Sequence, residues 1–556
     1  MGASPSPVFV NLPALFRFRS AFAGFVLAAA GLPLAAQTTA PAPATISAPA
    51  PAAASTLPVN ARIISCVRFA PPQILARDLM GIARQVYPGM QTELFPLLLL
   101  GKYGYPTFSG VSAQVPVVAY LFSGPDPEDQ GIVYMALLTA DSPARAALDS
   151  SLSSVTDPAT GWTFFSTSSA LLALAQANAP ALAKVATQPF AGDAEWTLPT
   201  QQLDLFRTDV QAIMQAQLTA AALPPDAFKW VDFSLQEIGS FQAIRIILDC
   251  KSDAIRLTVV GASKPGSPLA QLFATPPAAA VPGAQFISAD APVVGVFRTD
   301  APALQNFLNR IFADAHAASG PGSQPLLNSL QKGTDLYLSH SDGTAVATLS
   351  WPANGNATVQ FLAGSPSAND TLAQQFTALS QTTLPAVNQH LSPLASNTTP
   401  LPSLNGLYFG ATPGYFATAS SPQTLADLLQ TVKASQPAAN SAATTFVLKP
   451  GMLMVGKASP GIIAAAGLSS SSTLLPAASP DTLAALRSSS LPPVTFSASA
   501  GNNQGELQVA VPVSSIVEVF RILSAPAPSP SGPSATSSAP SSTSPAPAAV
   551  QISPAK

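Results

Sequence analysis

The stretch from 241 to 260, FQAIRIILDCKSDAIRLTVV, decides the fold because its apolar pattern returns 250 positions later. There the chain reads LPPVTFSASAGNNQGELQVA, from 491 to 510, and the match extends without a gap from 196–273 to 446–523. A long fixed period is typical of repeated structural units, so the sequence predicts an internal duplication. The matched apolar pairs are Trp196 with Phe446, Leu198 with Leu448, Leu203 with Leu453, Ile213 with Ile463, Ile244 with Val494, Ile246 with Phe496, Leu257 with Leu507, Val259 with Val509 and Leu272 with Ile522.

Earlier segments repeat at slightly different distances. Residues 65–82 match 294–311 at a distance near 229, residues 119–121 match 347–349 at 228, and Gly161-Trp162 matches Gly414-Tyr415 at 253. The growing distance requires an insertion in the second half, which the stretch rich in Gln and Thr from 375 to 404 supplies. We therefore expect two tandem domains of the same fold, 59–282 and 283–524. The alternative is that equivalent strands of the two halves lie side by side in one continuous sheet, which would merge the two domains.

Hairpins dominate the predicted strands. Apolar runs at 116–122 and 132–138 flank a loop of turn residues, and runs at 336–339 and 345–349 flank Ser341-Asp342-Gly343. Asp-Gly between apolar runs is a strong hairpin signal. Helices are expected at 143–152, 208–218, 303–315, 371–379 and 424–432. Each domain is thus predicted to be α+β, a mainly antiparallel sheet with helices packed on one face.

The first 36 residues have the pattern of a signal peptide. Arg17 and Arg19 precede an uncharged apolar run at 21–30, and small residues at Ala35 and Ala36 offer a cleavage point before Gln37. The secretion machinery reads this order of features. We expect an exported protein, periplasmic or extracellular. Beyond the leader no apolar run reaches the roughly 18 residues of a spanning helix, so no transmembrane segment is expected after cleavage.

Two segments have the composition of mobile chain. Residues 37–58 and 525–556 consist almost entirely of Ala, Pro, Ser and Thr. Such segments bury too little apolar surface to offset the entropy of ordering. The sequence predicts a linker at 37–58 and a disordered tail at 525–556.

The charge content argues against nucleic acid as a partner. Charged residues make up 9% of the chain, and the formal net charge is -3. No basic block is present to supply the phosphate contacts on which nucleic-acid binding depends.

Cys66 and Cys250 are the two cysteines of the chain. Both fall in strand-like apolar segments of the first domain, and an oxidising compartment permits a disulfide between them. The alternative is a pair of buried free thiols, which pack as small hydrophobic groups. We expect the disulfide.

The sequence contains no convincing catalytic or metal-binding motif. His316, His340 and His390 are too far apart in sequence to form a zinc motif. Ser329 and Lys332 fit the Ser-x-x-Lys pattern of penicillin-binding proteins, but the partner motifs are missing. We expect this pair at the exposed end of a helix, before a strand at Leu336.

Two further patterns have structural explanations. The acidic loop with Asp126, Glu128 and Asp129 lacks the glycine of a calcium-binding loop, so a solvated hairpin tip is expected. Phe-Arg-Thr-Asp occurs at 206–209 and again at 297–300, each time before helix-spaced residues. Thr and Asp there favour helix capping over a binding role for the Arg.

These observations predict an exported, non-catalytic protein of the cell envelope or exterior with a binding or structural role. The expected partner is an unknown envelope macromolecule or an apolar small molecule. No catalytic, cofactor-binding or metal-binding residues are expected. The alternative is a carrier of an apolar ligand in a cavity between sheet and helices, suggested by the segments 94–100 and 241–248. An enzyme of the serine acyl-transfer type is third.

Overall fold

The fold was analysed in a computed structural model of the chain. The structure describes residues 62–86, 110–123, 130–139, 141–143, 145, 152–189, 192–200, 211, 235–274, 276–288, 290–320, 324–353, 357–391, 407–434, 446–470 and 479–524. The leader, the linker, the tail, the loop of Asp126, Glu128 and Asp129, and the expected helix at 208–218 lie outside these residues, as does all but a few residues of the helix expected at 143–152.

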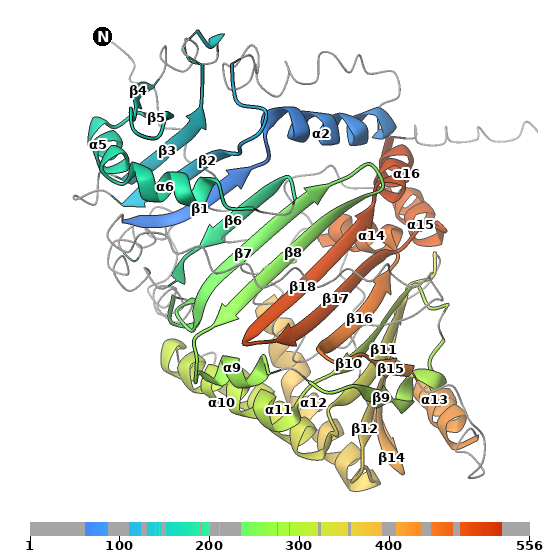
Figure 1. Ribbon diagram of the computed structural model, residues 1–556. Coiled ribbons are helices and arrows are strands. Elements are labelled where there is room, and N and C mark those ends of the chain that lie inside the picture. The colour runs from blue at the N-terminus through green and yellow to red at the C-terminus, as the bar shows by residue number, and fades with distance from the viewer. Residues whose placement is uncertain are drawn as a thin grey trace, which may run out of the picture.

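One antiparallel sheet of 16 strands organises the described part of the chain (Figure 1). The strands of its first half are β1 (Ile63–Phe69), β2 (Val117–Ser123), β3 (Gln130–Leu137), β4 (Ser153–Thr156), β5 (Trp162–Ser166), β6 (Ala194–Leu198), β7 (Phe241–Cys250) and β8 (Ala254–Ser263). Those of its second half are β10 (Val293–Arg298), β11 (Thr344–Ser350), β12 (Thr358–Ser365), β13 (Tyr408–Thr412), β14 (Gly414–Ala419), β16 (Met452–Ala458), β17 (Val494–Gly501) and β18 (Gln504–Pro512).

The helices are α2 (Pro72–Val86), α5 (Ser169–Ala177), α6 (Ala179–Ala186), α9 (Pro268–Leu272), α10 (Ala301–Ala318), α11 (Gln324–His340), α12 (Asp370–Leu391), α13 (Pro422–Ala434), α14 (Pro460–Ser470), α15 (Pro480–Ser488) and α16 (Val513–Ser524). A short 3-10 helix, η3 (Pro282–Phe286), and a two-stranded sheet of β9 (Ala279–Val281) and β15 (Phe446–Leu448) complete the fold. The mixed α+β class is as expected.

The order of strands is the same when each half is read outward from the middle of the sheet. The first half runs β8-β7-β6-β1-β2-β3-β5-β4, and the second runs β18-β17-β16-β10-β11-β12-β14-β13. β8 and β18 pair antiparallel in the centre, with Thr258 opposite Gln508, its counterpart at the distance of 250. The strands therefore form one continuous sheet, where separate domains would each have had a sheet of their own. The pairing removes two long unpaired edges, which are prone to association.

The 250-residue register holds for β7 and β8 but not for the strand before them. At that distance Trp196 in β6 corresponds to Phe446 in β15, which pairs with β9 in the small separate sheet. The place next to β10 that corresponds to β6 is taken by β16, with Val455 opposite Val296. The gap-free alignment is therefore wrong for β6, whose place is taken in the second half by β16. The second half contains an additional strand, β15, before β16.

Helices cover both faces of the outer strands in the second half, so the expectation of helices on one face is wrong for that half. On one face, α13 packs its Leu428 and Val432 into a core with Leu362 of β12. On the other face, the ring of Tyr337 in α11 lies 5.9 Å from that of Phe361, also in β12. Successive residues of a strand point to opposite faces, and here both are large and apolar, so both faces require cover.

The corresponding core in the first half forms under α5 and α6. Tyr120, Phe122, Phe164, Leu171 and Leu182 are fully buried there, with at most 1% of each side chain exposed. Burial of a side chain of this size stabilises a fold by about 1.5–3 kcal/mol. These two clusters hold the outer thirds of the sheet, while the central strands lie between them.

The segment at 336–339, expected as a strand, forms the end of α11. Asp342 ends the helix region by accepting hydrogen bonds from the amide and hydroxyl of Thr344, at 2.8 and 2.7 Å. Gly343 has φ +86°, and a Cβ there would lie 2.1 Å from the carbonyl oxygen of Thr299. The Asp-Gly signal was read correctly as a turn, but the turn joins a helix to β11 (Thr344–Ser350).

Other local predictions are confirmed. β2 and β3 form the expected hairpin, and the helices expected at 303–315, 371–379 and 424–432 lie within α10, α12 and α13. Asp300 caps α10 by accepting a hydrogen bond from the amide of Ala303 at 3.0 Å, as the capping interpretation of 297–300 requires. The other copy of that tetrapeptide, at 206–209, lies outside the described residues.

Glu195 joins the buried Arg68 and the partly buried Arg245 in the first half of the sheet. Its carboxylate, 1% exposed, lies 3.0 Å from Nη2 of Arg68 and 3.1 Å from Nε of Arg245. Arg68 also donates to the carbonyl oxygens of Val185 and Gln188, at the C-terminal end of α6. The three charges therefore fasten α6 to the sheet through β1 and β6.

Burial alone would raise the pKa of the Glu195 carboxyl, but the hydrogen bonds and positive charges of Arg245 and Arg68 hold it below the ordinary value. A carboxyl with a lowered pKa in the folded state stabilises the fold fully above its unfolded pKa. This contribution is lost as the pH falls through the lowered value.

We predict that Glu195→Gln destabilises the protein by about 3–5 kcal/mol at neutral pH, because it leaves Arg68 buried without a carboxylate. Urea unfolding measures this loss. Glu518→Gln is the control, since Glu518 pairs with the solvent-exposed Arg521 and should change stability little. Equal losses in the two variants would contradict the role of Glu195.

Candidate functional site

Ser329 and Lys332 lie in the interior of α11 and not at its end. Lys332 is exposed and Ser329 is half-buried. A nucleophile and base need both heads in hydrogen-bond reach inside a pocket that also supplies oxyanion donors. Because Lys332 is exposed on the surface of α11, the pair is not enclosed in such a pocket.

His316 and His340 occupy structural positions. The ring of His316 in α10 lies 2.6 Å from Oε1 of Gln324 and 3.2 Å from Oε1 of Gln331, so it fastens α10 to α11. Nδ1 of His340 lies 3.0 Å from the carbonyl oxygen of Leu336 in the same helix. His390 falls within α12, where its side chain lies outside the described residues.

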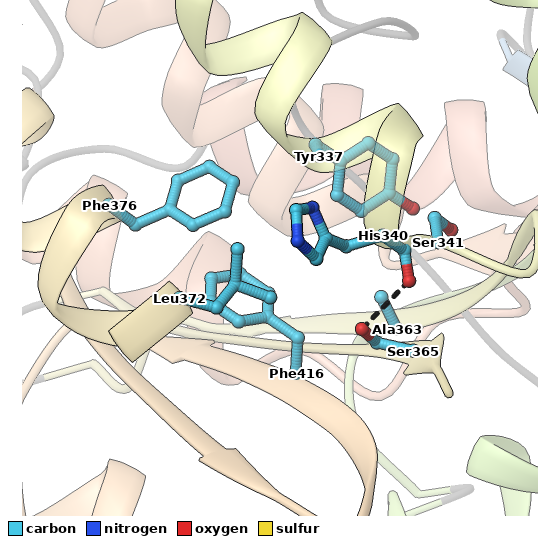
Figure 2. A pocket seen from close by; sticks show the side chains of 8 residues that line it. All are labelled: Tyr337, His340, Ser341, Ala363, Ser365, Leu372, Phe376 and Phe416. Atoms are coloured by element: carbon cyan, nitrogen blue, oxygen red, sulfur yellow. Dashed lines mark hydrogen bonds between the residues drawn. The ribbon is translucent and has the colours of Figure 1, made fainter. Parts of the chain in front are cut away.

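A small cavity lies beside His340, between α11, α12 and the sheet (Figure 2). Its volume of about 10 Å³ is room for roughly one water molecule. Ser365 donates a hydrogen bond to the carbonyl oxygen of His340 at 2.8 Å across its margin. This cavity is too small for the apolar ligand of the carrier hypothesis. It is lined by Tyr337, His340, Ser341, Ala363, Ser365, Leu372, Phe376 and Phe416.

A second group of charges, which the sequence did not reveal, fixes α2 to the ends of β6 and β7. Nζ of Lys251 lies 2.7 Å from Asp78 in α2, 3.1 Å from Asp249 and 3.7 Å from Asp193. Hydrogen bonds from Arg77 and Lys251 lower the pKa of Asp78 to about 2, against the effect of burial. Among the described residues, no group of His, Cys, Asp and Glu could hold a metal ion. The network holds α2 against the ends of β6 and β7.

The expected disulfide between Cys66 and Cys250 is wrong, because both are buried free thiols. Cys66 lies opposite Thr197, which lies opposite Arg245. Arg245 and Cys250 are five positions apart in β7, so the two cysteines point to opposite faces of the sheet. Two strand spacings and five residues separate them by about 10 Å across and about 17 Å along the strands, well beyond disulfide reach.

The central strands contain the surface with the clearest capacity for binding. Ile244 and Ile246 of β7, Leu257 and Val259 of β8, and Leu507 and Val509 of β18 share one face, since Ile246 pairs with Val259 and Val259 with Leu507. We call these six residues the central apolar face. None of the six is buried; each keeps an intermediate exposure, and Leu248 at the margin is 37% exposed.

Outer strands differ sharply from these central ones. All five residues of β5 are buried, as are the first five of β11. All nine residues of β18, in contrast, are of intermediate exposure. Apolar side chains of this size are normally buried where a sheet face is covered. The central apolar face is therefore incompletely covered, although it lies at the middle of the sheet.

One end of the central apolar face is closed by two aromatic rings. A Cβ on Gly261 would lie 2.6 Å from the ring of Phe241, and one on Gly505 would lie 2.5 Å from the ring of Phe273. Gly261 and Gly505 are paired across β8 and β18, so their lack of side chains lets both rings rest on the sheet. At the opposite end of the strands, α16 contacts β8 and β18, and α2 contacts β7.

The opposite face of the same strands is more polar. It carries Arg245, Thr258, Glu506, Gln508 and Ser497, together with the apolar Ile247 and Val260. The two faces of these strands therefore differ in polarity.

Comparison with known proteins finds no matching family model, no similar curated protein and no similar solved structure. The function of this surface must therefore be argued from its chemistry.

The sequence did contain a signal for the central apolar face. All six of its residues belong to the segments that match at the distance of 250, and four of them match each other: Leu257 with Leu507, and Val259 with Val509. The match was interpreted as evidence of an internal duplication. Alternation with polar residues was the available sign that one face of these strands is turned to water.

We predict that both thiols react slowly in the native protein at pH 8, because burial raises the pKa of Cys66 to about 12 and that of Cys250 to about 11. A thiol reagent should then count two thiols per chain after denaturation without a reductant. A count of zero after denaturation would show a disulfide, and rapid native labelling would contradict the burial.

Proposed function

We propose that this chain is an exported, non-catalytic binding protein of the cell envelope or exterior. Its partner is an envelope macromolecule that covers the central apolar face with an apolar surface of its own. The observation that carries the proposal is the partial exposure of Ile244, Ile246, Leu257, Val259, Leu507 and Val509 at the centre of the sheet. Contiguous apolar surface left exposed marks interaction sites in soluble proteins.

The breadth of the face favours a macromolecule. Its residues span three adjacent strands, which is about 10 Å between the outer two. The backbone amides beneath it are paired within the ladders, so the face offers apolar contact without hydrogen-bond donors. A broad apolar surface of this kind suits a partner with a matching surface.

Export rests on the leader pattern at 1–36. Among the described helices, none is long and apolar enough to cross a membrane. We propose cleavage before Gln37, which places the folded chain in the periplasm or outside the cell. The linker at 37–58 and the tail at 525–556 then connect it to its surroundings.

The two halves, 59–282 and 283–524, are proposed to derive from a duplication. The equal order of strands in both halves supports this origin. So does the register across the centre, where Leu257 lies opposite Val509 and Val259 opposite Leu507. In this arrangement the partner would meet Leu257 and Val259 of the first half together with their counterparts Leu507 and Val509 of the second.

The second candidate is a carrier of an apolar ligand, favoured by the same six aliphatic side chains. The 241–248 segment, suggested from the sequence as a lining, supplies two of them. A ligand would have to lie on the central apolar face, because the cavity beside His340 holds about one water. An enzyme remains third, since Ser329 and Lys332 lie on a helix surface.

We predict that the native protein enhances the fluorescence of anilinonaphthalene sulfonate and that Val259→Gln with Leu507→Gln removes at least half of the enhancement. The two residues face each other across β8 and β18, so the double change makes the centre of the face polar. Thr258→Gln, on the polar face, is the control and should leave the signal unchanged.

Displacement of the dye by oleate then separates the two candidates. Macromolecular binding predicts no displacement at micromolar oleate, and the carrier predicts displacement. Unfolding midpoints of each variant show whether the fold is intact. Equal dye binding by wild type and the double variant, with intact folding, would contradict the proposed site.

A further inference from the structure

The two halves of the chain also meet at one end of the central strands, where α10 of the second half packs against α9 of the first. Figure 1 shows both helices at that end. The segment 235–240 of the first half contacts α10 through side chains. Gln236 donates to Oδ2 of Asp314 at 3.4 Å, and Nη2 of Arg310 donates to Oε2 of Glu237 at 2.7 Å. We call Glu237, Arg310 and Asp314 the clasp.

Two buried atoms of the clasp lack a hydrogen bond. Oε1 of Glu237 and Nε of Arg310 are both buried, and neither has a hydrogen-bond partner among the described residues. The side chain of Glu237 is 17% exposed, and that of Arg310 is 31% exposed. Buried polar atoms are almost always hydrogen-bonded in folded proteins. The free carboxylate oxygen of Glu237 therefore indicates that a donor is missing from the ion pair as drawn.

A second carboxyl group identifies the missing donor. The carboxyl of Asp314 lies within hydrogen-bonding range of Glu237 and acts on it by charge. An ionised carboxylate only accepts hydrogen bonds, so two carboxyl groups bond to each other only when one of them holds a proton. Two adjacent negative charges also disfavour the state in which both groups are ionised. One proton on the free oxygen of Glu237 satisfies that atom and removes the repulsion.

The direction of the pKa of Glu237 agrees with this geometry. Burial raises the pKa of the Glu237 carboxyl, and the charge and hydrogen bond of Asp314 raise it further, which outweighs the opposite effect of Arg310. Glu195 is the converse case, because two arginines hold its pKa below the ordinary value. A carboxyl with a raised pKa in the folded state stabilises the fold fully below its unfolded pKa. This contribution is lost as the pH rises through the raised value.

The other elements around the clasp are bound elsewhere or carry no charge. α9 reads PLAQL and has no charged residue. Lys264, after β8, meets the segment through its backbone amide, which donates to the carbonyl oxygen of Ser240 at 3.0 Å. Arg245 of β7 binds Glu195, and the ring of His316 in α10 binds α11. Within the described part of the chain, the other two members of the clasp are thus the charged groups that act on its glutamate.

We propose that Glu237 and Asp314 share one proton and that the clasp holds the two halves together more firmly as the pH falls. The proton comes from solvent and binds the free oxygen of Glu237, while the other oxygen keeps its hydrogen bond from Arg310. When the proton leaves at higher pH, the two carboxylates repel each other across the contact between 235–240 and α10. The segment continues into Phe241, whose ring closes one end of the central apolar face, so the clasp adjoins that face.

Glu237→Gln tests this proposal by the sign of its effect on stability. The amide keeps an oxygen that accepts from Arg310 and offers an N–H to Asp314, as a protonated glutamate does. In urea unfolding of the full chain at pH 7.5, the unfolding equilibrium constant of the variant should be at least threefold smaller than that of wild type. The difference should shrink toward pH 4, where wild type is itself protonated. Glu195→Gln is the matched control and should lose stability at pH 7.5, because Glu195 is paired with arginines.

Asp314→Asn removes the second carboxylate and keeps an oxygen for Gln236. In that background Glu237→Gln should lose stability at pH 7.5, because it then removes an ordinary ion pair with Arg310. A loss or no change of stability on Glu237→Gln alone would overturn the proposal. That result is expected if a water molecule joins the free oxygen to Nε of Arg310 while Glu237 stays ionised. Protection of 235–240 from hydrogen exchange should also rise from pH 7.5 to pH 5.5 in wild type but not in Glu237→Gln, and equal pH dependence in both would likewise overturn it.

Discussion

The antiparallel pairing of β8 with β18 is the constraint on which the rest of the structure depends. It runs from Ala254 opposite Pro512 to Ala262 opposite Gln504, and it is the ladder that joins the eight strands of each half into one sheet. Without it, each half would end in a long strand with unpaired amides and carbonyls. The pairing also places the central strands far from the helices that cover the outer ones, which leaves their side chains partly exposed.

Ion pairs of the buried carboxylates Glu195 and Asp78 hold two helices against the sheet. Glu195 and Arg68 fasten α6, while Asp78 and Lys251 fasten α2. Charged groups taken from water stabilise a fold only when they are fully paired, so these networks specify where each helix docks more than they add to stability. Apolar packing supplies the stability in the outer thirds of the sheet. At the centre of the sheet the apolar side chains stay partly exposed, and we propose that they contact the partner.

Local features of the fold could be predicted from the sequence because they depend on neighbouring residues. The hairpin of β2 and β3, the helices α10 and α13 and the cap at Asp300 all follow from apolar spacing and turn chemistry. The prediction of a strand from Leu336 to Ser339 was wrong because four residues of apolar pattern do not distinguish a strand from the end of a helix. The turn signal that follows is compatible with a preceding strand and with a preceding helix.

Features that join distant parts of the chain could not be predicted. The repeat implied similar halves and allowed one continuous sheet as the alternative to two separate domains, but it did not show which edges meet. Cys66 and Cys250 fall on opposite faces of the sheet, which depends on the register of β6 between them. Glu195 has no basic neighbour in the sequence, and its two arginines come from β1 and β7. For the same reason, the exposure of Val259 and Leu507 became visible only once β8 and β18 were paired.

Hydrogen exchange followed by mass spectrometry tests the central pairing most directly. In one continuous sheet, the amides of 255–262 and 505–511 belong to interior strands, so both segments should be among the most slowly exchanging of the chain and should exchange at similar rates. Gln508→Pro removes an amide in the middle of β18 and should raise exchange in 255–262 as well. Fast exchange of either segment in the wild type, or protection of 255–262 that is unaffected by Gln508→Pro, would contradict the account.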